Sequence, residues 1–93
     1  QWVVPSQVEQ CLREHPAVAE CAVAACQVRG LAYLCAFVIA VEPNADAALA
    51  GDILRYAKSR LARHMRPVKV AFVSELPRTV TGKLQRHRLQ SQE

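Results

Sequence analysis

Two long apolar segments, separated by the dipeptide Arg29-Gly30, place the strictest limit on how this chain can fold. Residues Val18–Val28 and Leu31–Val41 are rich in valine, alanine, cysteine and other residues that suit a pleated, half-buried surface. The glycine between them can adopt the positive φ that a tight turn requires. The pattern predicts an antiparallel hairpin at the centre of the fold.

Helices are predicted on both sides of this hairpin. Ser6 and Glu9 have the spacing of a capping box, in which both side chains bond the first amides of a helix that ends before Pro16. Asp46 is expected to cap a second helix that continues to about Met65. The predicted apolar faces consist of Val8, Cys11, Leu12 and His15 in the first helix and of Leu49, Ile53, Ala57 and Leu61 in the second.

The C-terminal third combines a predicted strand, a loop and a short basic helix. Lys69–Leu76 is the strand, Pro77–Lys83 consists of turn formers, and Leu84–Gln90 is the helix, with Thr81 as its cap. In the strand, Val70, Phe72 and Leu76 are expected on one face and Ala71 and Val73 on the other. A chain of 93 residues has room for one small core. We therefore expect a small α+β sandwich with a three-stranded, mostly antiparallel sheet and helices packed on it.

Positive charge gathers in the second half of the chain. Ten of the twelve lysine and arginine residues lie from Arg55 onward, where only Glu75 and Glu93 are acidic. Such a field attracts nucleotides, phosphates, CoA, nucleic acid or an acidic membrane face without choosing among them. A basic nucleic-acid-binding module is one alternative, although the few aromatic residues lack a stacking motif. A non-catalytic interaction module is another.

The four cysteines show neither a CxxC pair nor a histidine at zinc-ligand spacing, so no metal site is expected. Cys21 and Cys35 lie in apolar runs, where a free thiol behaves as a small hydrophobe, and this suits a reducing compartment. We see no signal peptide and no clean membrane span, so the expected location is the cytoplasm. The start without methionine suggests a piece of a longer protein.

The segment Thr79–Lys83 places a glycine directly before a lysine at the predicted mouth of a helix. The ammonium, the backbone amides and the helix dipole would together attract an anion there. A phosphate-binding P-loop is excluded, because the positions for its first glycine and its final Ser or Thr hold Pro77 and Leu84. By itself, a Gly-Lys pair in a surface loop is most often an ordinary solvated turn.

The Gly-Lys pair is part of a longer motif. Glu75–Arg86 resembles the terminal signature of the adenylate-forming superfamily, which includes AMP-forming acyl-CoA synthetases, peptide-synthetase adenylation domains and luciferases. Val4–Glu9, His15–Val23 and Ala36–Val38 resemble further motifs of the same family. On this resemblance, residues 1–93 are identified as the C-terminal cap domain of an acyl-CoA or aryl-CoA ligase whose large N-terminal ATP- and acyl-binding domain is absent.

Within the superfamily, the chain is most similar to benzoate-type aryl-CoA ligases, and medium-chain acyl-CoA synthetases come next. Lys58–Ala62 and Gly82–Arg86 carry much of this similarity. Gln85 disfavours a peptide synthetase, which usually has an acidic residue there. Two departures weaken the transfer of thioester-stage contacts: Gln7 replaces the usual glutamate, and Cys26–Val28 lacks the usual glycine and aspartate.

The resemblance implies a two-step reaction. A carboxylate attacks the α-phosphate of MgATP to form an acyl-adenylate, and the CoA thiol then displaces AMP. Lys83 matches the adenylation lysine of the family. Gly82, Thr81 and Thr79 would support its loop, while His64 and Arg66 match a segment that contacts the CoA nucleotide in some aryl-CoA ligases. The isolated domain is expected to be inactive and to bind none of ATP, Mg²⁺ and CoA alone.

The resemblance also implies partners. They are the N-terminal domain of the same enzyme, an aromatic or medium-chain carboxylate, and CoA. Pro77 precedes the Gly-Lys pair at a spacing that the family associates with acetylation of the lysine, so a lysine acetyltransferase acting on Lys83 joins the set. Neither nucleic acid nor a membrane is expected as a partner.

Overall fold

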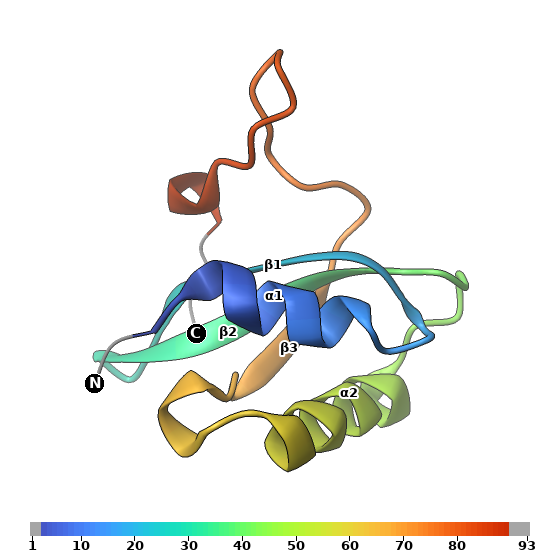
Figure 1. Cartoon of the computed structure of the whole chain (residues 1–93), viewed down its shortest axis with the longest axis vertical. Coiled ribbons are helices and arrows are strands. Elements are labelled where there is room, and N and C mark those ends of the chain that lie inside the picture. Colours follow the sequence, from blue (N-terminus) through green and yellow to red (C-terminus); the bar gives the residue numbers. More distant parts are fainter. Residues whose placement is uncertain (1–2, 90–93) are drawn as a thin grey trace.

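The computed structural model describes residues 3–89 and has an α+β architecture. Figure 1 shows the sheet with helices against it and a C-terminal loop that projects from the body. This confirms the predicted fold class. The elements in chain order are α1 (Pro5–Arg13), β1 (Val18–Val28), β2 (Leu31–Ala40), α2 (Ala47–Arg60), a 3₁₀ turn at Arg63–Met65, β3 (Lys69–Phe72) and a 3₁₀ turn at Arg86–Arg88.

The predicted hairpin is confirmed, and within the described residues the sheet has three strands in the order β1-β2-β3. Arg29 and Gly30 both have positive φ, 54° and 79°, which is the requirement of a tight type I′ turn. The β1–β2 pair is antiparallel, whereas β2–β3 is parallel. The sheet is therefore mixed, because α2 carries the chain back so that β3 runs in the direction of β2.

The third strand is shorter than the predicted Lys69–Leu76. It ends at Phe72, and the Val73 amide makes one more hydrogen bond, to the Val38 carbonyl at 2.9 Å. Leu76 packs with Ala71 and Val73 rather than with Val70 and Phe72. The expected side for Leu76 was wrong, because strict alternation stops where the strand stops.

The two faces of the sheet are covered by different parts of the chain. Helices α1 and α2 cover one face, over a core that includes Val8, Leu12, Cys21, Val23, Ala36, Val38, Ile53 and Ala57. On the other face, Leu76 and Leu89 of the C-terminal segment pack on Ala22, Cys26, Cys35 and Phe37. The C-terminal segment is thus anchored to the sheet on both sides of the loop that projects from it.

The predicted capping box in α1 is wrong. The helix begins at Pro5, with Val4 as its N-cap, and no side chain among the described residues caps it. Proline suits the first helical position, since its φ is already helical and its missing N–H would have no partner in the helix. Ser6 therefore lies inside the first turn, and the Glu9 carboxylate makes other contacts.

His15 lies two residues beyond the end of α1 and is buried, so it is outside the helix in which it was predicted. Its Nδ1 accepts a hydrogen bond from the Ala17 amide at 3.0 Å, so the ring proton is on Nε2, which donates to Asp52 Oδ2 at 2.8 Å. The ring also meets Tyr56 edge-on, with 5.0 Å between centroids. His15 therefore links α1, the start of β1 and α2, as a core histidine with both nitrogens satisfied.

The second helix begins as predicted and ends early. The Asp46 carboxylate accepts from the Leu49 amide at 2.9 Å, which confirms the cap. The helix stops at Arg60 instead of Met65, because Leu61 is extended at φ −112° and ψ 148°. Ile53 and Ala57 are buried as expected, and Leu49 and Leu61 are half-buried against the same core.

The cysteines differ from expectation in one respect. Cys21 is a free, buried thiol as expected, but Cys35 forms a disulfide with Cys26. The register pairs Cys26 with Tyr33, so Cys26 and Cys35 are diagonal neighbours on one face of the hairpin, with Cα atoms 5.9 Å apart. Among residues 3–89, no helix has both the length and the apolar character needed to cross a bilayer.

Candidate functional site: the Lys83 hairpin

Residues 77–85 fold into a narrow antiparallel hairpin, which we call the Lys83 hairpin. Its stem is held by a bridge between Arg78 and Leu84 and by the Gln85 amide, which donates to the Pro77 carbonyl at 2.9 Å. Near the tip, the Thr79 amide donates to the Lys83 carbonyl at 2.8 Å. Figure 1 shows this hairpin, in orange and red, extending away from the sheet and both helices.

The tip is ordered by the residues that the sequence singled out as loop support. The Thr79 hydroxyl lies 2.9 Å from the Thr81 hydroxyl and accepts from the Lys83 amide at 3.0 Å. The Gly82 amide donates to the Thr79 carbonyl at 2.9 Å. Gly82 has a φ of +88°, a conformation that few other residues adopt without strain. Local hydrogen bonds and one glycine therefore define the turn.

Lys83 is exposed at this tip, which also carries the fully exposed Val80. Across residues 3–89, no side chain or carbonyl forms an ion pair or hydrogen bond with its ammonium. Backbone atoms hold the residue in place, while the charge itself stays open to a ligand outside this domain.

The predicted helix after the lysine is absent from the described part of its range. Leu84 belongs to the hairpin stem, and only a 3₁₀ turn follows, at Arg86–Arg88. The Thr81 side chain contacts Thr79 instead of capping a helix. The expected contribution of a helix dipole was therefore wrong, because the stem uses the backbone groups that a helix would need. Gln90 lies outside the described residues.

Arg78 joins the tip to the sheet. Its Nη1 donates to the Gly82 carbonyl at 3.0 Å, and its Nη2 donates to the Glu20 carboxylate at 2.8 Å. Both side chains of this ion pair are well exposed, 41% for Arg78 and 52% for Glu20. Water competes for such a pair, so it contributes only about 0–1 kcal/mol.

A second contact at the base of the hairpin is largely removed from water. The side chain of Glu9 is 4% exposed; its carboxylate accepts from the Val23 amide at 2.9 Å and from Arg86 Nε at 2.8 Å, and also binds Arg86 Nη2. The hydrogen bonds from Arg86 to Glu9 raise the pKa of Arg86 despite its partial burial, which acts in the opposite direction. Nothing in the sequence indicated that Glu9 and Arg86 form an ion pair, since 77 positions separate them.

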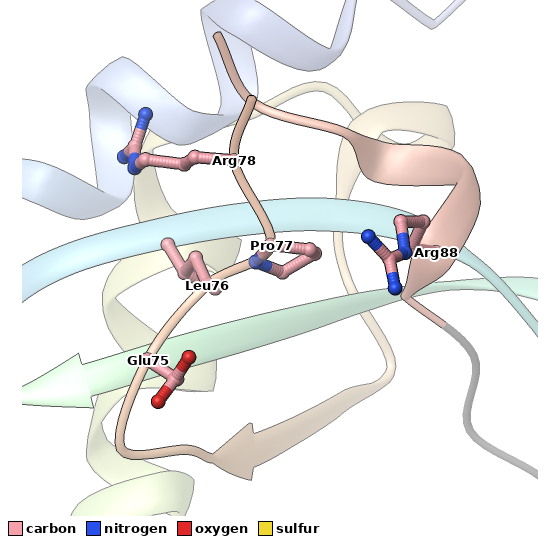
Figure 2. Close-up of a pocket in the computed structure, with 5 residues that line it drawn as sticks. All are labelled: Glu75, Leu76, Pro77, Arg78 and Arg88. Atoms are coloured by element: carbon pink, nitrogen blue, oxygen red, sulfur yellow. The ribbon is translucent and has the colours of Figure 1, made fainter. Parts of the chain in front are cut away.

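An open groove of about 480 Å³ lies beside the hairpin base. Its lining residues are Glu75, Leu76, Pro77, Arg78 and Arg88. Figure 2 shows Arg88 directed from the 3₁₀ turn toward Pro77, with Glu75 on the other side of the groove. Lys83 is not among the lining residues, so the groove is separate from the tip.

His64 and Arg66 lie elsewhere in the molecule. Both are half-buried in the connection between α2 and β3, and Arg66 Nε donates to the Leu61 carbonyl at 2.9 Å. Figure 1 shows this connection and the Lys83 hairpin at opposite ends of the molecule. The structure therefore does not unite the predicted CoA-binding residues with the lysine. Within residues 3–89, no group of three or more His, Cys, Asp or Glu side chains gathers to hold a metal ion.

Comparisons with known proteins agree with this architecture. A family described as the AMP-binding enzyme C-terminal domain matches residues 7–83. A benzoate CoA ligase from Burkholderia xenovorans LB400 superposes with a TM-score of 0.88 at 39% identity, over 95% of this chain and 18% of that one. An anthranilate CoA ligase, AuaEII, in complex with anthranoyl-AMP gives 0.86 at 41% identity, over 95% and 17%.

The relatives found by sequence are also CoA synthetases and CoA ligases. The human mitochondrial acyl-coenzyme A synthetase ACSM5 is 44% identical over 94 residues, which cover 96% of this chain and 16% of the synthetase. A 3-hydroxybenzoate–CoA ligase of Aromatoleum sp. (strain CIB) is 37% identical over 91 residues, covering 96% and 17%. This chain belongs to the AMP-binding enzyme C-terminal domain family. It spans about a sixth of the length of these relatives.

Proposed function

We propose that residues 1–93 form the mobile C-terminal domain of an ATP-dependent, AMP-forming carboxylate–CoA ligase, in which Lys83 supplies positive charge during adenylate formation. The observation that carries this proposal is the position of Lys83. Its ammonium stands exposed at the tip of a projecting hairpin, without a partner among the described residues. A domain that used this lysine for its own stability would pair it instead.

The chemistry of adenylation calls for such a charge. A carboxylate must approach the α-phosphate of ATP, and the two groups repel each other because both are anionic. An ammonium with three donors can lie between them and stabilise the charge that builds up on the phosphate oxygens. Lysine suits this task better than arginine, since it is a compact point charge on a flexible stem while guanidinium is a planar fork.

The remaining parts of the site belong to another domain. This chain offers an exposed tip and an open groove, and neither encloses a nucleotide together with an acid. The partner is accordingly the N-terminal domain of the same enzyme, which would bind ATP, as its Mg²⁺ complex, and the carboxylate. Three of the named relatives are benzoate, anthranilate and 3-hydroxybenzoate CoA ligases, and this favours an aryl acid, with a medium-chain acid as the alternative.

The second half-reaction uses a different surface in this proposal. Arg66 would pair a phosphate of CoA, and His64 would lie against its adenine. The connection that carries these residues lies at the end of the molecule opposite the Lys83 hairpin. This separation supports a rotation of the domain between the two steps.

Two finer points belong to the same proposal. Acetylation of Lys83 would remove its charge and stop adenylation, and the exposed tip leaves the lysine open to an acetyltransferase. The cytoplasm stays the predicted location, with the mitochondrion as the alternative that the name of the human relative suggests.

The test is carboxylate-dependent release of pyrophosphate by the enzyme that contains this domain together with its N-terminal portion. With benzoate as substrate, Lys83→Ala should lower the rate by about 10²–10³-fold, the usual scale for one electrostatic donor. Lys83→Arg should stay impaired. Lys58→Ala, which removes an exposed lysine on α2, is the matched control and should leave the rate unchanged.

The second half-reaction shows whether a loss in the variant is specific to adenylation. Thioester formation from preformed benzoyl-adenylate should survive Lys83→Ala. Equal losses in both half-reactions, or normal pyrophosphate release by Lys83→Ala, would contradict the assigned role. Binding of oligonucleotides by the domain that weakens steeply with salt would favour the nucleic-acid alternative.

A further inference from the structure

Two ion pairs connect the Lys83 hairpin and its C-terminal continuation to the rest of the described chain, and their surroundings differ. Arg78–Glu20 is exposed on both sides. In Arg86–Glu9 the arginine side chain is 37% exposed, but the glutamate side chain is only 4% exposed. An exposed pair tolerates many geometries at similar energy, whereas a buried carboxylate requires its partners in place. The Arg86 contact is therefore the more restrictive of the two.

Glu9 is a fixed anchor for this contact. It belongs to α1, which packs on the sheet through Val8 and Leu12, and its carboxylate is also bound by the Val23 amide of β1. The carboxylate cannot follow Arg86 if the hairpin moves. A loop that bonds to it must adopt one position relative to the sheet.

Arg86 transmits that position to the hairpin. It presents two donors, Nε and Nη2, to the two carboxylate oxygens, and such a fork restricts orientation as well as distance. The residue before it, Gln85, forms the last backbone hydrogen bond of the stem, to Pro77. Lys83 lies two residues before Gln85, on the same side of the stem and nearer the tip. The direction of the stem is thus set directly at Arg86.

We propose that Arg86, held by the buried carboxylate of Glu9, is the positioning residue that aims the Lys83 hairpin at the neighbouring domain. The inference rests on the proposed function of Lys83 and adds a residue that need not touch the substrate. A misplacement of about 1 Å costs a reaction as much as about a hundredfold in rate, so the aim of a distant arginine matters. Pyrophosphate release depends on this aim, and the thioester step does not.

The first experiment measures both half-reactions, with benzoate and with preformed benzoyl-adenylate, for Arg86→Met in the enzyme with both domains. Pyrophosphate release should fall by about 10- to 100-fold. Thioester formation should stay unchanged under conditions where circular dichroism shows the variant to be folded. Arg88→Met is the matched control and should leave both rates unchanged. Among the described residues, the hydrogen bonding of the Arg88 side chain is limited to one exposed 3.4 Å contact with Gln85.

A double variant separates positioning from stability. Arg86→Met alone leaves the Glu9 carboxylate buried without its cation, which destabilises the fold. Glu9→Gln together with Arg86→Met removes both charges and leaves an amide oxygen that can accept from the Val23 amide. Stability should return in the double variant while pyrophosphate release stays low. Hydrogen exchange of the peptide that covers residues 77–85 should stay faster than in the parent enzyme.

The outcomes are distinct. Recovery of pyrophosphate release together with stability in the double variant, or equal losses in both half-reactions, would overturn the positioning role. Normal pyrophosphate release by Arg86→Met, with Lys83→Ala impaired, would overturn it as well and leave the proposed function intact. Normal release by Lys83→Ala would refute the proposed function itself.

Discussion

Lys83 and Thr79 are joined twice across the tip of the hairpin. The Lys83 amide donates to the Thr79 hydroxyl at 3.0 Å, and the Thr79 amide donates to the Lys83 carbonyl at 2.8 Å. These bonds hold the backbone of the lysine and leave its four-carbon side chain free. The position of the tip therefore comes from the backbone, and the reach of the ammonium comes from the side chain.

Gly82 makes this turn possible, and its replacement should affect activity more than global stability. Its φ is +88°, and apart from its chain neighbours no atom of residues 3–89 lies within 4 Å of the place that a Cβ would take, so Gly82→Ala meets strain rather than a clash. The strain, about 1–2 kcal/mol, is relieved when the tip adopts another turn. We expect slower pyrophosphate release by the two-domain enzyme and an unchanged urea midpoint.

Gly30 supplies the matched control. It also has a positive φ, +79°, and apart from its chain neighbours no atom of the described residues lies within 4 Å of its Cβ position, but it lies in the β1–β2 turn of the central hairpin. Gly30→Ala should lower the free energy of unfolding by about 1 kcal/mol and leave the adenylation rate of the folded enzyme unchanged. The reverse pattern for the two glycines would contradict the assignment of the tip.

Arg66 should serve the thioester step alone. If its guanidinium pairs a phosphate of CoA, Arg66→Met should raise the KM for CoA by about tenfold or more, the usual value of a hydrogen bond between charged groups. Pyrophosphate release should not change. His64→Ala should have a smaller effect of the same kind. Unchanged KM values for CoA in both variants would remove this surface from the CoA site.

His15 should contribute strongly to stability. His15→Ala removes a ring that is 6% exposed and leaves the Ala17 amide without its acceptor, which should cost about 2–3 kcal/mol in the free energy of unfolding. Asp52→Asn keeps an acceptor for Nε2, so its cost should be within about 0.5 kcal/mol. Urea denaturation measures both values. A large cost for Asp52→Asn would contradict this account, in which an amide oxygen replaces the carboxylate as the acceptor.

The buried thiol of Cys21 should make the domain less stable at alkaline pH. Burial raises the pKa of its thiol from 9.0 to about 11. Between these values the unfolded chain loses the thiol proton while the native chain keeps it, so the free energy of unfolding falls as the pH rises. The urea midpoint should fall from about pH 9 to about pH 11, and less so in Cys21→Ala. Equal slopes for both proteins would contradict the assignment.

Local patterns in the sequence were sufficient for most of the architecture. The apolar runs around Arg29-Gly30 predicted the hairpin, and Asp46 predicted the start of α2, because both signals act over a few neighbouring residues. The family motif singled out Lys83 and its supporting residues in the same way. The boundaries were less accurate. Both α2 and β3 end earlier than predicted, since the ends of a helix or strand depend on packing rather than on propensity.

Only the tertiary structure decided which distant residues meet. Glu9 had the local spacing of a helix cap, yet its carboxylate is used by Val23 and by Arg86, and Cys35 had the character of a free core thiol, yet it pairs with Cys26. A side chain takes the partner that best compensates its burial, and that partner is defined by the packing of the whole chain rather than by its neighbours in sequence. The sequence therefore indicated which residues were candidates for burial or for a site, but it did not indicate the partners of Glu9.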